Sequence, residues 1–393
     1  MHGKLVLFQA GFRPFFLLAG LDGVANMAAW LWIYHRPESW PESAIPAMYW
    51  HAHEMLFGFV GAAIAGFLLT AVPNWTGRPP YRGAMLWLLS GLWLGGRITM
   101  LPFAILPSAV STATALLFFP AFGLAVAPAL VQSRAYRNLP FLGLLFLLFA
   151  AELCFQGAFG IPPELGRHIG LYAALDIILV MIAIIGGRIV PNFTRNALAR
   201  QGVTATIQSR PWIDRGAILS LLLMVALDMA MPLSRISGVA SLLAAIFHAM
   251  RLSQWQGHRT LRDPLLWALH LGYGWLVLGL ALKAAALLSS AMAAEKWLHA
   301  LTVGTIGTMI LAVMSRAALG HSGRPLVAPR PMSVAFLLVS AAAISRVAFP
   351  AAFPEYYDKI IALSGALWIA AFAIYLTVYT PILLKPRQDG KPG

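Results

Sequence analysis

Histidine is the residue type that could do chemistry inside the apolar segments of this sequence. His51 and His53 open one such segment, and His168 and His299 stand near the start of two others. Imidazole is a common ligand for haem iron, copper and zinc. Ionisable side chains within membrane segments usually mark function, although a polar residue at a segment end can also be an interfacial anchor. We therefore interpret these histidines as candidate metal ligands, with anchoring as the alternative.

His53 and His299 stand in segments that repeat each other without a gap. Each is followed by glycine at the fifth and eighth positions and later by Gly-Arg-Pro. The glycines of the first pattern are Gly58, Gly61, Gly304 and Gly307. All matching positions are 246 residues apart, which indicates an internal repeat. We expect these glycines to lie at helix contacts or beside a flat ligand, and the two histidines to converge on one metal centre.

Neighbouring residues bear on how the histidines are used. His51 and His53 are two positions apart, about 200° around a helix, so they serve two different centres or the helix begins between them. Glu54 could hold a ligand imidazole in one tautomer, or could be a helix-start carboxylate that the dipole favours. His270 lies within another segment, where packing beside Tyr273 competes with metal binding.

Arg97 and Arg346 stand near the ends of two further apolar segments, shortly before Pro102 and Pro350. A ligand that carries carboxylates would favour such arginines, because guanidinium pairs with carboxylate through two parallel hydrogen bonds. The alternative is an ion pair of either arginine with Asp228. We count both arginines as candidate cofactor-binding residues.

The segments that carry these residues are those of an all-α, multi-pass membrane protein. Hydrophobic residues make up 60% of the 393 residues and charged residues 11%, whereas a soluble domain has about 25% charged residues. Apolar runs of about 20 residues predict twelve membrane spans. The spans are 13–34, 51–72, 83–101, 107–131, 139–159, 167–190, 213–231, 235–256, 265–288, 297–319, 332–350 and 357–380. The net charge of +14 lies mainly in the gaps between them, so the expected partner is the lipid bilayer and not nucleic acid.

Lysine and arginine are distributed unevenly over the two sides of these spans. Of the 28 basic residues, 20 fall on the side of both termini and five on the other side. Basic residues accumulate on the cytoplasmic side, so both termini and the loop 187–215 are predicted to be cytoplasmic. The histidines that open the second, sixth and tenth spans then lie near the outer face.

A third, weaker copy completes the repeat pattern, because VPNWT at 72–76 matches VPNFT at 190–194. The chain is predicted to be one membrane domain, 1–393, built of three parallel four-helix units. The units are approximately 10–131, 137–256 and 262–381. Cys154 is the only cysteine and no CxxCH motif is present, so any haem would be held without covalent attachment.

Four stretches of the sequence closely resemble the NnrS family of bacterial membrane proteins. They are WHAHEMLFGFVGAAIAGFLLTAVPNWTG at 50–77, FRPFF at 12–16, VPNFTRN at 190–196 and HALTVGTIGTMILAVMSRAALGHSGRPL at 299–326. The resemblance implies a twelve-helix protein of the bacterial inner membrane that contains haem and copper. It also implies a link to nitric oxide, nitrosative stress and denitrification. The family's histidines carry over to His51, His53, His168, His270 and His299.

The resemblance turns the candidate residues into a cofactor hypothesis. His53 and His299 are predicted to bind the iron of a b-type haem, with Gly58 and Gly304 clearing space for it. Arg97 and Arg346 are predicted to face its propionates. Copper is predicted at a separate site of His51 with His168 or His270.

The predicted architecture also resembles the catalytic subunit of haem–copper oxidases, with haem ligands at the outer ends of helices two and ten. Two features depart from that subunit. Leu301 stands where it has the second histidine of His-x-His, and the span 213–231 holds no histidine. We therefore expect a single haem between spans two and ten, without an oxidase-type binuclear centre.

Two functions agree with these patterns. The first is a haem- and copper-binding protein of the nitric oxide response, in which nitric oxide is bound, converted or sensed. The second is a transporter for a metal ion or small metal complex that uses the same histidines, an alternative favoured by the repeats and the glycine-rich spans. The sequence decides neither enzymatic activity nor oligomeric state.

Overall fold

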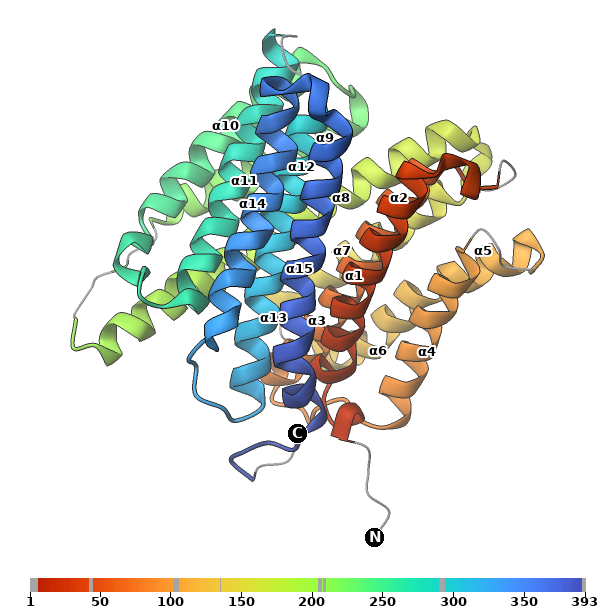
Figure 1. Cartoon of the computed structure of the whole chain (residues 1–393). Helices are drawn as coiled ribbons and strands as arrows, with labels where there is room; N and C mark the ends of the chain where they lie inside the picture. The colour runs from red at the N-terminus through yellow and green to blue at the C-terminus, as the bar shows by residue number, and fades with distance from the viewer. Residues whose placement is uncertain are drawn as a thin grey trace. The chain divides into compact units, whose positions relative to one another are not determined.

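The computed structural model describes residues 6–41, 45–101, 106–134, 136–203, 207, 210–289 and 294–390, and this part of the chain contains helices but no strands (Figure 1). Its helical segments follow the twelve predicted spans. Ten of them are long and apolar enough to cross a membrane. The chain is therefore an all-helical, multi-pass membrane protein, as the sequence predicts.

The helices of the first half of the chain are interrupted in two of the predicted spans. They are α1 Phe12–His35, α2 Ala47–His53, the π-helix η3 Glu54–Phe59, α3 Val60–Thr76, α4 Ala84–Thr99, α5 Ser108–Leu116, α6 Phe118–Gln132, α7 Pro140–Phe155 and α8 Pro163–Arg200. The second span thus consists of α2, η3 and α3 in direct succession. The fourth is divided between α5 and α6.

The second half of the chain contains one further interrupted span, the tenth. Its helices are α9 Pro211–Ala230, α10 Arg235–Ser253, α11 Pro264–Ser289, α12 Ala294–His299, the π-helix η7 Ala300–Gly307, α13 Thr308–His321, α14 Arg330–Ala352 and α15 Tyr357–Leu384. The tenth span is therefore α12, η7 and α13.

Two of the twelve helical segments fall outside the group of ten. Helix α4 has 16 residues, which at 1.5 Å per residue reach about 24 Å, less than the hydrocarbon thickness of about 30 Å. Helix α9 has 20 residues but carries Asp214, Arg215 and Asp228. That these two cross the membrane stays a prediction.

The sixth predicted span, 167–190, is shorter than the helix in the structure. Helix α8 continues past residue 190 to Arg200 and contains Pro191. The predicted loop 187–215 is wrong in extent, because its first part is helical and α9 begins at Pro211. Polar residues such as Asn192 and Arg195 end an apolar run but do not end a helix.

Contacts within the chain define two compact units. One comprises Met1–Leu175, Arg316–Leu326 and Tyr375–Gly393, and the other comprises Asp176–Ser315 and Val327–Ile374. In the first, α1 packs against α3 and η3, and α6 packs against α3, α4 and α7. In the second, α10 packs against α9 and α11, and η7 packs against α11 and α14. The arrangement in three four-helix repeats is not confirmed and stays a prediction.

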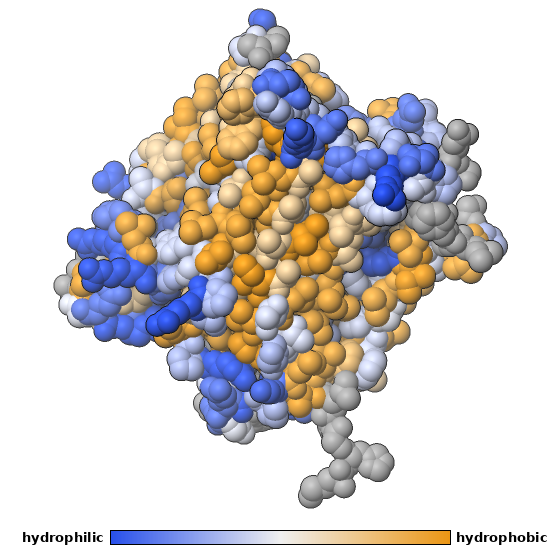
Figure 2. Space-filling model, in the orientation of Figure 1, coloured by the Kyte–Doolittle hydropathy of each residue, from blue (hydrophilic) through white to orange (hydrophobic). Residues whose placement is uncertain are grey.

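Large apolar side chains are exposed along the helices, and Figure 2 shows hydrophobic residues over much of the visible surface. Leu124, Phe146 and Leu219 are 75%, 67% and 65% exposed. Water would oppose so much exposed apolar surface, whereas lipid tails do not. These faces are in contact with the bilayer.

The second and tenth spans share two unusual backbone features at the step of 246 residues. The π-helices begin at Glu54 and at Ala300, the first residues after the two predicted ligand histidines. Farther on, Gly77 and Gly323 both adopt left-handed conformations, with φ of 66° and 69°. The π-helix is rare in proteins, so its appearance at equivalent positions agrees with the predicted repeat of these two spans.

The backbone at the ends of these two copies is equivalent too. The amide N–H of Arg78 donates to Pro73 O over 3.1 Å, and that of Arg324 donates to Leu319 O over 3.0 Å. The weaker copy in α8 has neither a π-helix nor a left-handed glycine, because it is continuous α-helix through the matching region. The difference agrees with its weaker sequence match.

Candidate functional site

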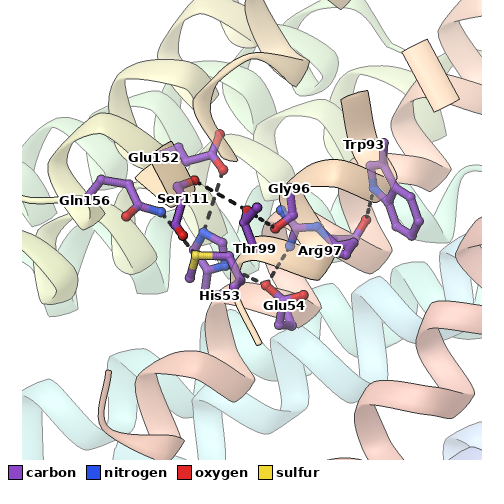
Figure 3. A network of polar contacts seen from close by, with 11 residues as sticks. His53, Glu54, Trp93, Gly96, Arg97, Thr99, Ser111, Glu152 and Gln156 are labelled. Atoms are coloured by element: carbon purple, nitrogen blue, oxygen red, sulfur yellow. Dashed lines mark hydrogen bonds and ion pairs between the residues drawn. The ribbon is translucent and has the colours of Figure 1, made fainter. Parts of the chain in front are cut away.

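The His53 imidazole is enclosed within the first unit. His53 is the last residue of α2, and its side chain is 0% exposed. Its ring lies 4.9 Å from that of Phe57 and 4.4 Å from that of Phe155, measured between ring centres. Nδ1 lies 2.9 Å from Oε1 of Glu54 (Figure 3). The enclosed ring is therefore held in orientation by aromatic contacts and one carboxylate.

Glu54 connects His53 to Arg97. The Nη1 group of Arg97, on α4, donates to the same Oε1 of Glu54 over 2.7 Å. Asp22, on α1, lies next to Arg97, and both side chains lie against the Cα of Gly58. The indole N–H of Trp93 donates to the Gly58 carbonyl over 3.1 Å. Three helices and η3 thus meet around one buried charged group.

Glu152 faces the other nitrogen of His53. It belongs to α7, is 1% exposed, and its Oε1 lies 3.7 Å from His53 Nε2 (Figure 3). The two carboxylate oxygens of Glu152 have no hydrogen-bond partner among the described residues. The same is true of Nε2 of His53. A buried carboxylate in an apolar region requires a compensating positive charge or a proton. Glu152 and the Nε2 atom of His53 are therefore the groups of this network that retain hydrogen-bonding capacity.

The rim of this network is held by weaker contacts. The side-chain amide of Gln156 donates to Met100 Sδ over 3.5 Å. The hydroxyl of Thr99 lies 3.1 Å from Gly96 O and 3.4 Å from Ser111 O. These contacts join the ends of α4, α5 and α7 beside His53.

The surroundings of His299 in the second unit are different. His299 ends α12, is partly buried, and is followed by Ala300 instead of a carboxylate. A Cβ atom at Gly304 would lie 2.5 Å from the Trp275 indole, and one at Gly307 would lie 2.5 Å from the Trp368 indole. The repeated glycines therefore lie at helix contacts, which is one of their two predicted roles. A cofactor role for Gly58 and Gly304 stays a prediction.

The other predicted ligands have separate surroundings. His51 stacks on Trp30, with ring centres 4.5 Å apart and an interplanar angle of 16°, and Trp30 also lines a pocket with Tyr34 and Trp40. His168 lies against Tyr172, with 4.3 Å between ring centres.

His270 and Arg346 also have local partners. Nε2 of His270 lies 3.0 Å from the Thr194 hydroxyl, and Arg346 donates to the Tyr357 hydroxyl over 3.3 Å. Within the described ranges, no group of three or more His, Cys, Asp or Glu side chains could hold a metal ion. The structure unites His53 with Arg97 through Glu54, and the predicted copper site stays a prediction.

The family model described as NnrS protein matches residues 6–387 of this chain. The chain belongs to the NnrS family. No individual curated protein matches it. The NnrS match includes both π-helices and every predicted site residue, so the resemblance of the four sequence stretches is confirmed at the level of the family.

The geometry of this NnrS protein bears on two of the alternatives left open by the sequence. Helix α2 begins at Ala47, before His51 and His53, so both histidines lie on one helix and face different neighbours. Glu54 contacts His53 directly, as a residue that orients a ligand imidazole would.

The predicted ion pair of Arg97 or Arg346 with Asp228 is wrong. Arg97 pairs with Glu54, and Asp228 pairs with Lys283. Glu152 is not among the residues predicted from the sequence. A carboxylate is rare in a membrane segment, and this rarity could have marked Glu152 as a candidate. The sequence does not show which residue of another helix it faces.

Proposed function

We propose that this chain is a haem- and copper-binding protein of the bacterial inner membrane that acts in the response to nitric oxide. Membership of the NnrS family supports this function. The observation that carries it is the pair of π-helices, each of which begins directly after a predicted ligand histidine. Isolated π-helical turns are frequent at functional sites, because they change the direction in which neighbouring side chains point.

The donor atoms at His53 fit a metal ligand. Glu54 binds Nδ1 and so favours the tautomer in which Nε2 carries the free lone pair. Nε2 has no hydrogen-bond partner, as a nitrogen available to a metal requires. A haem iron bound there would allow nitric oxide to bind in exchange for one of its histidine ligands. His299 is the proposed second ligand on grounds of its equivalent place in the repeat.

The chain's own residues would prepare this position in three ways. Glu54 orients His53 and holds its imidazole in one tautomer. Arg97 balances the charge of Glu54 and retains donors that suit a propionate. Phe57 and Phe155 enclose the imidazole and keep water away from it. A buried, oriented and charge-balanced imidazole is a strong metal ligand.

Copper binding rests on the family resemblance. His51, His168 and His270 are the proposed ligands, each of which has an aromatic or hydroxyl neighbour in the structure. Their assignment is tested by measuring copper separately from haem in single alanine variants. Copper that is unchanged in all three variants would contradict it.

We also propose that both termini lie in the cytoplasm, which the distribution of 20 basic residues against five supports. A reporter fused after Arg200, at the end of α8, is expected to be active only in its cytoplasmic form. Activity of a periplasmic reporter at this point would reverse the topology and place His53 near the cytoplasmic side.

The proposed function is tested by the purified full-length protein. We expect a Soret band that persists through purification, bound copper, and a shift of the Soret band when nitric oxide is added. The control is the His53→Ala variant purified in the same way. A colourless wild-type protein with loosely bound metal would contradict the proposal and agree with metal transport.

A further inference from the structure

The second unit contains a buried tyrosine–histidine pair that the proposed function does not use. Tyr273 on α11 and His248 on α10 are both 0% exposed. The phenolic oxygen of Tyr273 lies 2.7 Å from Nδ1 of His248, and the centres of the two rings are 5.5 Å apart. Two packed helices thus bring a phenol and an imidazole into direct contact in an apolar interior.

The direction of this hydrogen bond follows from the second partner of Tyr273. Nη1 of Arg251, which can only donate, lies 3.2 Å from the same phenolic oxygen. In the described part of the chain, Nδ1 of His248 is then the acceptor that Tyr273 has for its own proton. A buried hydroxyl proton without an acceptor is costly, so Tyr273 donates to His248.

Arg251 is held in place beside the pair by contacts of its own. Its Nε donates to Oδ1 of Asp214 over 2.6 Å, and its Nη1 also donates to the main-chain oxygen of Ala183 over 2.8 Å. Gly187 makes room for the guanidinium, since a Cβ at this position would overlap it. Asp214 balances the charge of Arg251, so the ion pair adds no net charge beside the phenol.

Trp255 places a second oxidisable ring next to the pair. It follows α10, is 0% exposed, and its ring centre lies 4.4 Å from that of Tyr273. An electron can pass between two rings in contact without any movement of the rings, whereas a proton moves only along a hydrogen bond. Tyr273 therefore has a neighbour that can carry its electron and another, His248, that can take its proton.

We propose that Tyr273 and His248 form a redox site, at which the phenol loses an electron while its proton passes to the imidazole. The O–H bond of Tyr273 breaks, an N–H bond forms at Nδ1 of His248, and the products are a neutral tyrosyl radical and an imidazolium. The electron passes to nitrogen dioxide, a small one-electron oxidant that dissolves in lipid and is reduced to nitrite. The choice of this oxidant rests on the proposed link to nitric oxide, whereas the pair uses none of the proposed haem or copper ligands.

Electron paramagnetic resonance of the purified full-length protein tests this proposal. Nitrogen dioxide is generated by radiolysis of nitrite in the buffer, and ascorbate added afterwards removes the radicals of exposed tyrosines such as Tyr136 and Tyr356. We expect a tyrosyl signal that remains in the wild type and is lost in Tyr273→Phe. Tyr375→Phe, which is expected to keep the signal, is the matched control. Tyr375 is also 0% exposed, but its hydroxyl has no hydrogen-bond partner among the described residues.

The role of His248 is tested by His248→Gln, because an amide oxygen accepts a hydrogen bond but is too weak a base to take the proton. We expect this variant to lose the signal although Tyr273 is present. Wild-type protein that is produced and purified in deuterium oxide is expected to form the radical more slowly, because a deuteron is then transferred. This comparison involves no substitution, so it stays decisive if a variant does not fold.

A wild type without the signal, or a signal that persists in Tyr273→Phe, would overturn the redox site. Loss of the signal in Tyr375→Phe alone would also overturn it, since the radical would then belong to a phenol without a proton acceptor. An unchanged signal in His248→Gln, or equal rates in the two solvents, would overturn the transfer of the proton to His248. The Soret band of the same samples reports haem binding separately, so failure of the proposed function would be recognised independently.

Discussion

The segments around His53 and His299 have the same backbone but different surroundings. Both contain a π-helix directly after the histidine and a left-handed glycine at the same later position. His53 is fully buried beside two carboxylates, whereas His299 is partly buried and followed by Ala300. The local backbone is thus alike in the two segments, while charged side chains lie against the first π-helix and tryptophans lie against the second.

The two histidines therefore differ in the residues that could hold their imidazoles as proposed ligands. Only His53 is followed by a carboxylate that can orient its imidazole. The glycines show the same contrast, since Gly58 lies against Asp22 and Arg97 while Gly304 lies against Trp275. Variants at matched positions can therefore measure how far the two copies differ.

The largest contrast is expected between Arg97 and Arg346. Arg97→Met removes the cation that balances Glu54, and loss of one partner from a buried ion pair costs about 3–5 kcal/mol of unfolding free energy. Arg346→Met removes a hydrogen bond to the Tyr357 hydroxyl, which costs about 1 kcal/mol. Thermal unfolding in detergent would compare the two variants. Equal losses would show that the Glu54 network contributes no more than a single neutral contact.

The next contrast concerns two glycines at the same place in the repeat. A Cβ at Gly307 would lie 2.5 Å from the buried Trp368 ring, whereas one at Gly61 would make ordinary contact with Phe119 at 3.4 Å. We expect Gly307→Ala to lose about 1–3 kcal/mol of stability through overpacking. Gly61→Ala is expected to change stability little. A greater loss at Gly61, measured by the same unfolding assay, would contradict the packing described for the two copies.

The sequence predicted these helices well because hydropathy and helix length are local properties. It identified His53 and His299 as equivalent through an ungapped register. It did not reveal the π-helices, because their hydrogen-bond pattern leaves no mark on hydropathy. It gave Arg97 the wrong partner, Asp228, and gave Glu152 none, since the pairing of buried charges depends on which helices pack together.

The smallest contrast concerns the carboxylate that follows His53. Glu54→Gln keeps a hydrogen-bond acceptor near Nδ1 but removes the negative charge, so the affinity of the His53 site for its metal is expected to fall about tenfold. Ala300→Ser, at the equivalent position after His299, adds no charge and is the matched control. Transfer of haem to an excess of a haem-free globin would measure both affinities. An unchanged affinity in Glu54→Gln would show that Glu54 does not contribute to binding at the His53 site.

The haem content of purified His53→Ala and His299→Ala variants tests the central claim most directly. His51→Ala is the control, because His51 is on the same helix but stacks on Trp30. We predict that His51→Ala keeps its haem, and that both other variants lose most of it, because each removes one axial ligand. Full haem content with an unchanged spectrum in either His53→Ala or His299→Ala would contradict paired ligation. Haem loss in His51→Ala alone would show that the iron is bound on the other face of α2, by His51.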